Sequence, residues 1–286
     1  MNILVTGSNG QLGSEIKKLP GNISGANFFF TDIDTLDISN QLDLVSYCKK
    51  TNFQYIINCA AYTAVDKAET DIELATRINV SAVKNLAEAA KVNNSFLIHV
   101  STDYVFSGHN YTPYKEEDEI SPTSVYGKTK ADGEKAALQY QNSIIIRTSW
   151  LYSSFGNNFV KTILRLAKER ESLSIISDQV GTPTYAEDLA KTILDIIIYQ
   201  GKNTPKPGIY HFSNEGVCSW YDFAKEIADI SAIPIKVKPI ETKDYPTPAQ
   251  RPCYSVFNKS KIKTTFEIEI PYWKDSLKKC LKEINS

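Results

Sequence analysis

The strongest constraint on the fold of this 286-residue chain is a fivefold alternation of short apolar runs with longer helical patterns between residues 2 and 171. The apolar runs read NILVTG, NFFFTDID, YIINCAA, SFLIHVST and SIIIRTSWLY. Strands that are apolar at consecutive positions are buried on both faces, which is typical of a parallel sheet between two layers of helices. The sequence therefore predicts an α/β fold built on a doubly wound parallel sheet.

Composition excludes several classes of function. The formal net charge of −1 argues against a nucleic-acid-binding protein, which needs a clustered basic surface. No apolar run approaches the ~20 residues that a membrane span requires, and the N-terminus lacks the basic and apolar segments of a signal peptide. Five cysteines are scattered without a CxxC pair, so we expect a cytoplasmic protein with reduced thiols and no metal cluster.

A glycine-rich segment, TGSNGQLG, lies where the first apolar run meets the first helical pattern. Glycines at this junction allow a tight turn and a close approach to a pyrophosphate, which the start of the helix stabilises. The segment predicts a dinucleotide site, with a purely structural turn as the alternative. The predicted loop residues are Gly7, Asn9, Gly10, Gln11, Leu12 and Gly13.

An acidic residue, Asp32, follows the second apolar run, 19 positions after Gly13. A carboxylate at this place accepts hydrogen bonds from the adenosine ribose and repels a 2′-phosphate. The glycine segment contains no Arg or Lys that would attract such a phosphate, so we expect appreciable use of NADH. Asp34 and Asp37 lie in the same loop, and the sequence alone does not decide which carboxylate takes this role.

A tyrosine followed four residues later by a lysine occurs three times. The pairs are Tyr111/Lys115, Tyr126/Lys130 and Tyr221/Lys225. The first is interrupted by Pro113, and the third lies in the irregular second half, where an amphipathic surface helix is expected. Only the second pair opens the helical pattern that follows the fourth apolar run, so context selects it.

The selected pair predicts a reduction site together with Thr102 at the end of the fourth run. Residues four apart share a helix face, and that face would look into the crevice at the strand ends. Tyr126 would protonate a carbonyl oxygen that receives hydride at its carbon, and Thr102 would hydrogen-bond that oxygen. Lys130 would bind the nicotinamide ribose and lower the high pKa of the phenol toward working pH.

Several segments together resemble the dTDP-4-dehydrorhamnose reductases, a family of extended short-chain dehydrogenases/reductases with a Rossmann-like domain. They are TGSNGQLG, NCAAYTAVDKAE, STDYVFSG, YGKTKADGE, RTSWLY, GNNFVKTILRLA and DQVGTPTYAEDLA. The resemblance implies reduction of a dTDP-4-dehydro sugar with NADPH or NADH, and a catalytic trio of Thr102, Tyr126 and Lys130. Further cofactor contacts implied by it are Asp37, Ile38, Ala60, Ala61 and Thr63. The family motif often carries His where Tyr62 stands, which leaves that one contact open.

The resemblance also assigns substrate contacts. An aromatic face packs well against a sugar, and a guanidinium matches phosphate oxygens, although core packing and a surface Arg are the alternatives for the indole and for the Arg. The implied substrate residues are Val65, Thr102, Asp103, Tyr104, Trp150, Asn158 and Arg251, with Asp66 nearby. We expect a dinucleotide-binding domain over residues 1–148, to which 185–215 returns. A smaller mixed α/β substrate lobe would comprise 149–184 and 216–286.

Some members of the family dimerise around Mg²⁺ held by glutamates, and Glu15, Glu187 and Glu283 stand at the matching places. Solvated surface acids are the alternative, so no metal ligand is assigned, and the chain is expected to be a monomer or a homodimer. Two other functions stay open. One is another nucleotide-sugar reductase or epimerase, and the other is a non-catalytic regulatory subunit like that of methionine adenosyltransferase.

Overall fold

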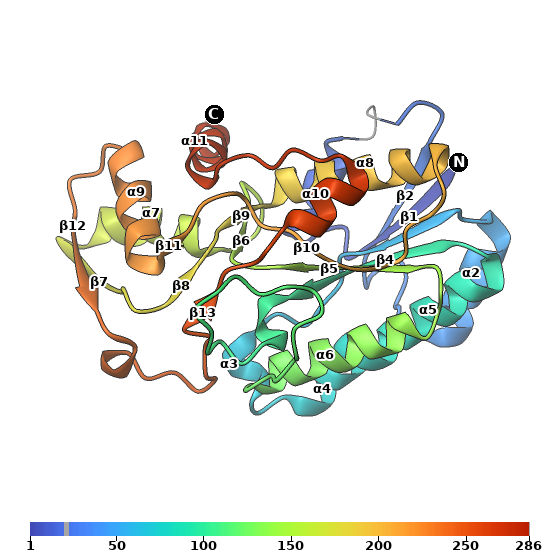
Figure 1. The fold of residues 1–286 in the computed structure, drawn as a ribbon, viewed down its shortest axis with the longest axis horizontal. Coiled ribbons are helices and arrows are strands. Elements are labelled where there is room, and N and C mark those ends of the chain that lie inside the picture. The colour runs from blue at the N-terminus through green and yellow to red at the C-terminus, as the bar shows by residue number, and fades with distance from the viewer. Residues whose placement is uncertain (20–22, 286) are drawn as a thin grey trace.

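The computed structural model describes residues 1–19 and 23–285 and is built around a six-stranded, all-parallel sheet (Figure 1). Its strands follow the order β2-β1-β3-β4-β5-β10. Their bounds are β1 Asn2–Thr6, β2 Asn27–Thr31, β3 Tyr55–Asn58, β4 Phe96–Thr102, β5 Ser143–Thr148 and β10 Gly208–His211. The predicted doubly wound parallel sheet is confirmed.

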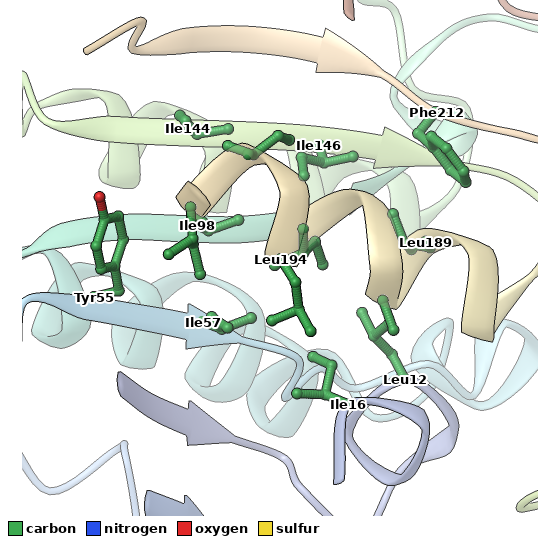
Figure 2. Packing of buried hydrophobic residues seen from close by; sticks show 14 of the residues in the cluster. Leu12, Ile16, Tyr55, Ile57, Ile98, Ile144, Ile146, Leu189, Leu194 and Phe212 are labelled. Carbon is green, nitrogen blue, oxygen red and sulfur yellow. The ribbon is translucent and has the colours of Figure 1, made fainter. Parts of the chain in front are cut away.

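Helices cover both faces of this sheet, which explains the continuous apolar runs. In β1, Ile3 and Val5 face one layer and Leu4 faces the other, and all three are fully buried. The first layer contains α1 (Gln11–Lys17), α8 (Ala186–Lys202) and α10 (Ser260–Phe266), and the second contains α2 (Gln41–Thr51), α5 (Ala82–Asn93) and α6 (Val125–Leu138). Figure 2 shows Leu189 and Leu194 of α8 packed over Ile98 and Ile146 of the sheet.

The third helical pattern is interrupted in the structure. It runs through α4 (Ile72–Thr76), a π-helical turn over Arg77–Ser81 and then α5, after the short helix α3 (Val65–Ala68). The π turn directs the buried Asn79 side chain toward the Tyr62 backbone, which its oxygen and nitrogen both bind. The backbone that leaves β3 is thereby held beside α6, where the cleft described below is formed.

A second apolar cluster lies beside the sheet, at the left of Figure 1. It is formed mainly by α7 (Phe159–Glu169), α9 (Trp220–Ile230) and α11 (Trp273–Ile284) with the strand pair β7 (Ser172–Ile176) and β12 (Lys236–Ile240). Small strands connect it to the sheet: β6 Leu151–Tyr152, β8 Val180–Gly181, β9 Thr184–Tyr185, β11 Cys218–Ser219 and β13 Tyr254–Ser255. The two-domain division remains a prediction; α10, within the expected smaller lobe, packs on the sheet cluster.

The connections place an opening between β1 and β3. From β1 the chain moves to β2 on one side, and the next strand, β3, pairs on the other side. Loops that diverge at such a switch point leave a crevice at the carboxyl ends of the strands.

None of the helices described is long and apolar enough to cross a membrane.

Candidate active site

The glycine loop lies at this switch point. Gly7 has a φ of +64°, and a Cβ there would lie 2.5 Å from the Ala60 backbone nitrogen, so only glycine fits without displacing the backbone that follows β3. The Asn9 amide donates to Asp32 Oδ2 at 2.8 Å, which ties the loop to the end of β2. The Asn9 side-chain oxygen accepts from Lys17 Nζ at 2.9 Å. A carboxylate and a cation therefore both bind Asn9, the first through its backbone amide and the second through its side chain.

A pocket of about 280 Å³ opens beside this loop. Its lining includes predicted cofactor residues and several apolar side chains that the prediction missed. The predicted ones are Gly7, Gly10, Asp32, Asp37, Ile38, Ala60 and Ala61. The missed ones include Ile33, Leu36, Ile78 and Ala82, which no local motif distinguishes from core residues. Asn9, also predicted, does not line the pocket and instead binds Asp32.

A second, larger pocket of about 550 Å³ adjoins the first and shares Gly10, Cys59 and Ala61 with it, so the two form one continuous cleft. The structure brings together here nearly all the remaining predicted residues. They are Gln11, Leu12, Thr63, Val65, Thr102, Asp103, Tyr104, Tyr126, Lys130, Trp150 and Asn158. Residues 11 and 158 also join across the cleft, because Asn158 Nδ2 donates to Gln11 Oε1 at 3.0 Å.

The predicted catalytic trio lies in this second pocket. Ser124 caps α6 by accepting from the Gly127 amide, so the helix begins at Val125 and carries Tyr126 and Lys130 on consecutive turns of one face. Thr102 is the last residue of β4, and its hydroxyl donates to Asp103 Oδ1 at 3.0 Å. All three side chains of the trio are almost completely buried.

The pKa of Tyr126 moves in the direction opposite to the one expected from the sequence. Burial raises it to about 12, and a hydrogen bond with Thr102 offsets only part of that effect. Lys130 is not among the causes of this pKa, and its Nζ donates to the Val100 carbonyl at 2.7 Å. A phenol with this pKa is protonated at neutral pH, which suits a proton donor rather than a base.

The acid next to the trio has its own unusual environment. Burial raises the pKa of Asp103 to about 6, while hydrogen bonds from Ser255 and Thr102 act in the opposite direction. Its Oδ2 atom is buried without a hydrogen-bond partner among the described residues.

The other two tyrosine–lysine pairs lie away from the cleft. Tyr111 is in a loop and 92% exposed. Tyr221 and Lys225 lie on α9, where the lysine forms an exposed pair with Asp229. Neither pair lines the cleft, so the choice made from sequence context agrees with their positions.

Two stacked indoles form the far wall of the cleft. Trp150, with a φ of +48°, lies with its ring centroid 3.6 Å from that of Trp220, and their planes differ by 12°. Both line the larger pocket. Trp150 also packs against the second apolar cluster, so it serves the core and the cleft at once. Trp220 was missed, because its helix lies 70 residues later in the chain and nothing local marks it.

Arg251 is not among the residues that line the cleft. Its guanidinium forms two hydrogen bonds with Asp66, at 3.0 and 2.7 Å, and the Ala249 amide binds the same carboxylate. The bond with Arg251 is the main cause of the lowered pKa of Asp66. Diphosphate binding by Arg251 stays a prediction.

Tyr62, the position that departs from the family motif, donates its hydroxyl to Asp71 and does not line the cleft.

The three glutamates considered as metal ligands do come together, with carboxylate oxygens within 4.8 Å of one another. Glu15 and Glu187 are buried, so the alternative of solvated surface acids is wrong for these two. Lys18 Nζ lies 2.8 Å from both Glu15 and Glu283. Burial raises the pKa of Glu187, but hydrogen bonds from Lys191 and Lys279 outweigh it and lower the pKa to about 2. Three ammonium groups thus neutralise the cluster, and nothing here supports Mg²⁺.

Comparison with known proteins agrees with this geometry. The family model described as RmlD substrate binding domain matches residues 1–286. A dTDP-4-dehydrorhamnose reductase from Aggregatibacter actinomycetemcomitans is 45% identical over 96% of this chain and 97% of its own length. The chain belongs to this reductase family.

Solved structures of the family superpose closely on this one. A dTDP-4-dehydrorhamnose reductase from Clostridium acetobutylicum is 43% identical with a TM-score of 0.94, covering 100% of both chains. The reductase from Bacillus anthracis, solved in complex with NADP, is 37% identical with a TM-score of 0.94 over 99% of each chain. The fold and the dehydrorhamnose reductase family predicted from sequence are therefore both confirmed.

Proposed function

We propose that this chain reduces the C4 keto group of dTDP-4-dehydro-6-deoxy-L-mannose to give dTDP-L-rhamnose, with hydride from NADPH or NADH. One observation carries the proposal. In a chain from this reductase family, Thr102, Tyr126 and Lys130 converge in a cleft that continues into the pocket beside the glycine loop. A purely regulatory protein has no need of all three side chains in that arrangement.

A reduced nicotinamide, when bound, supplies hydride to the carbonyl carbon. The side chains of this protein protonate the carbonyl oxygen and form hydrogen bonds with it. Tyr126 is the proton donor, since its high pKa keeps it protonated until the developing alkoxide takes the proton. Thr102 donates to Asp103 in this structure and, in the proposed complex, turns its single proton toward the sugar oxygen. Asp103 Oδ1, which this turn releases, then accepts from a sugar hydroxyl.

The cofactor site favours neither dinucleotide strongly. Asp32 is placed to accept from a ribose hydroxyl. It already accepts from the Asn9 and Ile33 amides, and these two donors partly offset its negative charge. Lys17 supplies the cation that the glycine segment lacks, through its bond to Asn9. We propose that the chain uses NADH appreciably and NADPH as well.

The sugar and its diphosphate lie on the other side of the cleft in this proposal. The paired indoles of Trp150 and Trp220 offer an apolar face for the 6-deoxy sugar, opposite Val65 and Tyr104. Arg251 reaches a phosphate from the edge of the cleft. Its guanidinium either breaks its hydrogen bonds with Asp66 or donates to Asp66 and the phosphate at the same time.

The test is an assay of the purified protein against a panel of nucleotide 4-keto sugars, following absorbance of NADH and NADPH and identifying the products. We expect dTDP-4-dehydro-6-deoxy-L-mannose to be consumed fastest and dTDP-L-rhamnose to form. Faster turnover of another nucleotide sugar would assign the chain to a related reductase or epimerase. Binding of dinucleotide without turnover of any sugar would favour the regulatory alternative.

A further inference from the structure

A buried chain of polar groups connects the glycine-loop strand to the catalytic lysine. Asn58 Oδ1 accepts from Thr6 Oγ1 at 2.8 Å and from the Ala60 amide at 3.1 Å. Asn58 Nδ2 lies 2.9 Å from His99 Nδ1, and His99 Nε2 lies 3.3 Å from Lys130 Nζ. The side chains of residues 6, 58, 99 and 130 are each at most 2% exposed. Solvent therefore does not set the direction of these hydrogen bonds.

The direction of the chain follows from its fixed end. The Ala60 backbone amide can only donate, so the Asn58 carbonyl oxygen faces it, and the Asn58 amino group faces His99. An amino group also only donates, so His99 Nδ1 is the acceptor. A neutral imidazole that accepts at Nδ1 carries its proton at Nε2, the atom that faces Lys130.

This orientation has a consequence for Lys130. An ammonium group has three donors and no acceptor, so it cannot accept the His99 N–H, whereas a neutral amine offers a lone pair to it. The Val100 carbonyl accepts from Nζ in either form. Resting on the proposed function, we propose that His99 is a positioning residue that stabilises the neutral amine of Lys130 and thereby sets the pH above which reductive activity declines.

The other charged groups around Lys130 do not stabilise its neutral amine in the way that His99 does. Burial lowers the pKa of Lys130 to about 8, and Glu134 acts in the opposite direction. That carboxylate is shared, because Arg147 binds it at 2.8 Å and Ser101 donates to it. The pKa of His99 is itself lowered by burial and by Lys130, which agrees with a neutral ring. The titratable or charged groups described around this amine are His99 of β4, Tyr126 and Glu134 of α6, Arg147 of β5, Cys59 after β3 and Asp103 after β4.

The test reverses the direction of the chain without changing its shape. Asn58→Asp keeps an acceptor for Thr6 and Ala60 but presents an oxygen to His99 Nδ1, which then carries the proton. Nε2 becomes an acceptor and favours the ammonium of Lys130, so the alkaline limb of turnover should move up by at least about one pH unit. His99→Leu, which removes the N–H that faces Nζ without adding a charge, should move it in the same direction.

Thr6→Val is the matched control. It removes a buried donor from the same chain but leaves the Ala60 amide to orient Asn58, so the alkaline limb should stay in place. NADH affinity, followed by fluorescence against pH, gives a second readout that needs no sugar substrate. If no 4-keto sugar is turned over, the proposed function fails, while the binding profile still tests the role of His99.

The proposal would be overturned if the alkaline limb of turnover did not move in folded Asn58→Asp and His99→Leu, or if it moved equally in Thr6→Val. Circular dichroism and thermal unfolding establish that each variant is folded. If the buried charge of Asn58→Asp prevents folding, the neutral variant His99→Leu gives the same reading of the alkaline limb.

Discussion

The two walls of the cleft are built in different ways. The cofactor wall comes from the ends of strands β1 to β4 and the first turn of α6, where the neighbours of each residue follow from the sheet order. The proposed substrate wall comes from separated segments, since Trp150 stacks on Trp220, which lies 70 positions later in the chain. Under the proposed function, the chemistry rests on periodic structure and recognition of the sugar rests on long-range contacts.

This difference separates the expected effects of mutations. A change on the cofactor wall should affect turnover or the dinucleotide while substrate affinity is kept. A change on the substrate wall should weaken substrate affinity while the affinity for the dinucleotide is kept. Variants that affected both walls equally would show that the division has no functional meaning.

The largest effect is expected for Tyr126→Phe. The ring keeps its packing against Tyr104, with centroids 5.3 Å apart, while the proton donor is lost. Turnover should fall by about 10² to 10⁴, with NADH affinity unchanged. Tyr111→Phe and Tyr221→Phe are the matched controls and should keep near-native turnover. A larger loss in Tyr221→Phe, or near-native turnover in Tyr126→Phe with chemistry rate-limiting, would refute the assignment.

Trp150→Ala should have the next largest effect. It removes one of the two stacked indoles, so the KM for the dTDP sugar should rise by about tenfold or more while the Kd for NADH stays the same. Trp220→Ala should weaken substrate binding in the same way, and Trp220→Phe should retain most of it. Equal loss of cofactor affinity, or a fall in thermal stability that accounts for the whole effect, would make Trp150 a core residue only.

Lys17→Ala sharpens the comparison within the cofactor wall. The exposed ammonium is expected to favour a 2′-phosphate modestly, so kcat/KM for NADPH relative to NADH should fall by about two- to fivefold. Raised ionic strength should reduce the same ratio in the wild type. A wild-type preference for NADPH above about a hundredfold would invalidate the argument from Asp32.

The smallest effect is expected when Mg²⁺ is added or chelated and the Tm is measured. Because Lys18, Lys191 and Lys279 already neutralise the glutamate cluster, millimolar MgCl₂ or EDTA should change the Tm by less than about 1 °C. Lys18→Met is the informative variant, since removing its ammonium leaves Glu15 and Glu283 without this cation. A clear rise in the wild-type Tm with Mg²⁺ would contradict the lysine-neutralised cluster.

The sequence was most informative where structure is periodic. The apolar runs predicted the sheet and its layers, because burial on both faces leaves a local signature. The glycine segment predicted the loop at the first strand end, whereas Ile38, Ala60, Ala61 and Thr63 came from the family resemblance. The same patterns could not show that the Lys130 ammonium binds the Val100 carbonyl, or that burial raises the pKa of Tyr126. Trp220 and the Arg251–Asp66 pair were missed because their partners depend on how irregular segments fold back.

The central claim is that this cleft transfers hydride to C4 of a dTDP-4-dehydro sugar, with Tyr126 supplying the proton. The most direct measurement uses NADH deuterated at the transferring position, dTDP-4-dehydro-6-deoxy-L-mannose and NMR of the isolated product. The account predicts deuterium at C4 in a single configuration, formed much more slowly by Tyr126→Phe. Oxidation of NADH without deuterium at C4, or a product with both configurations, would contradict it.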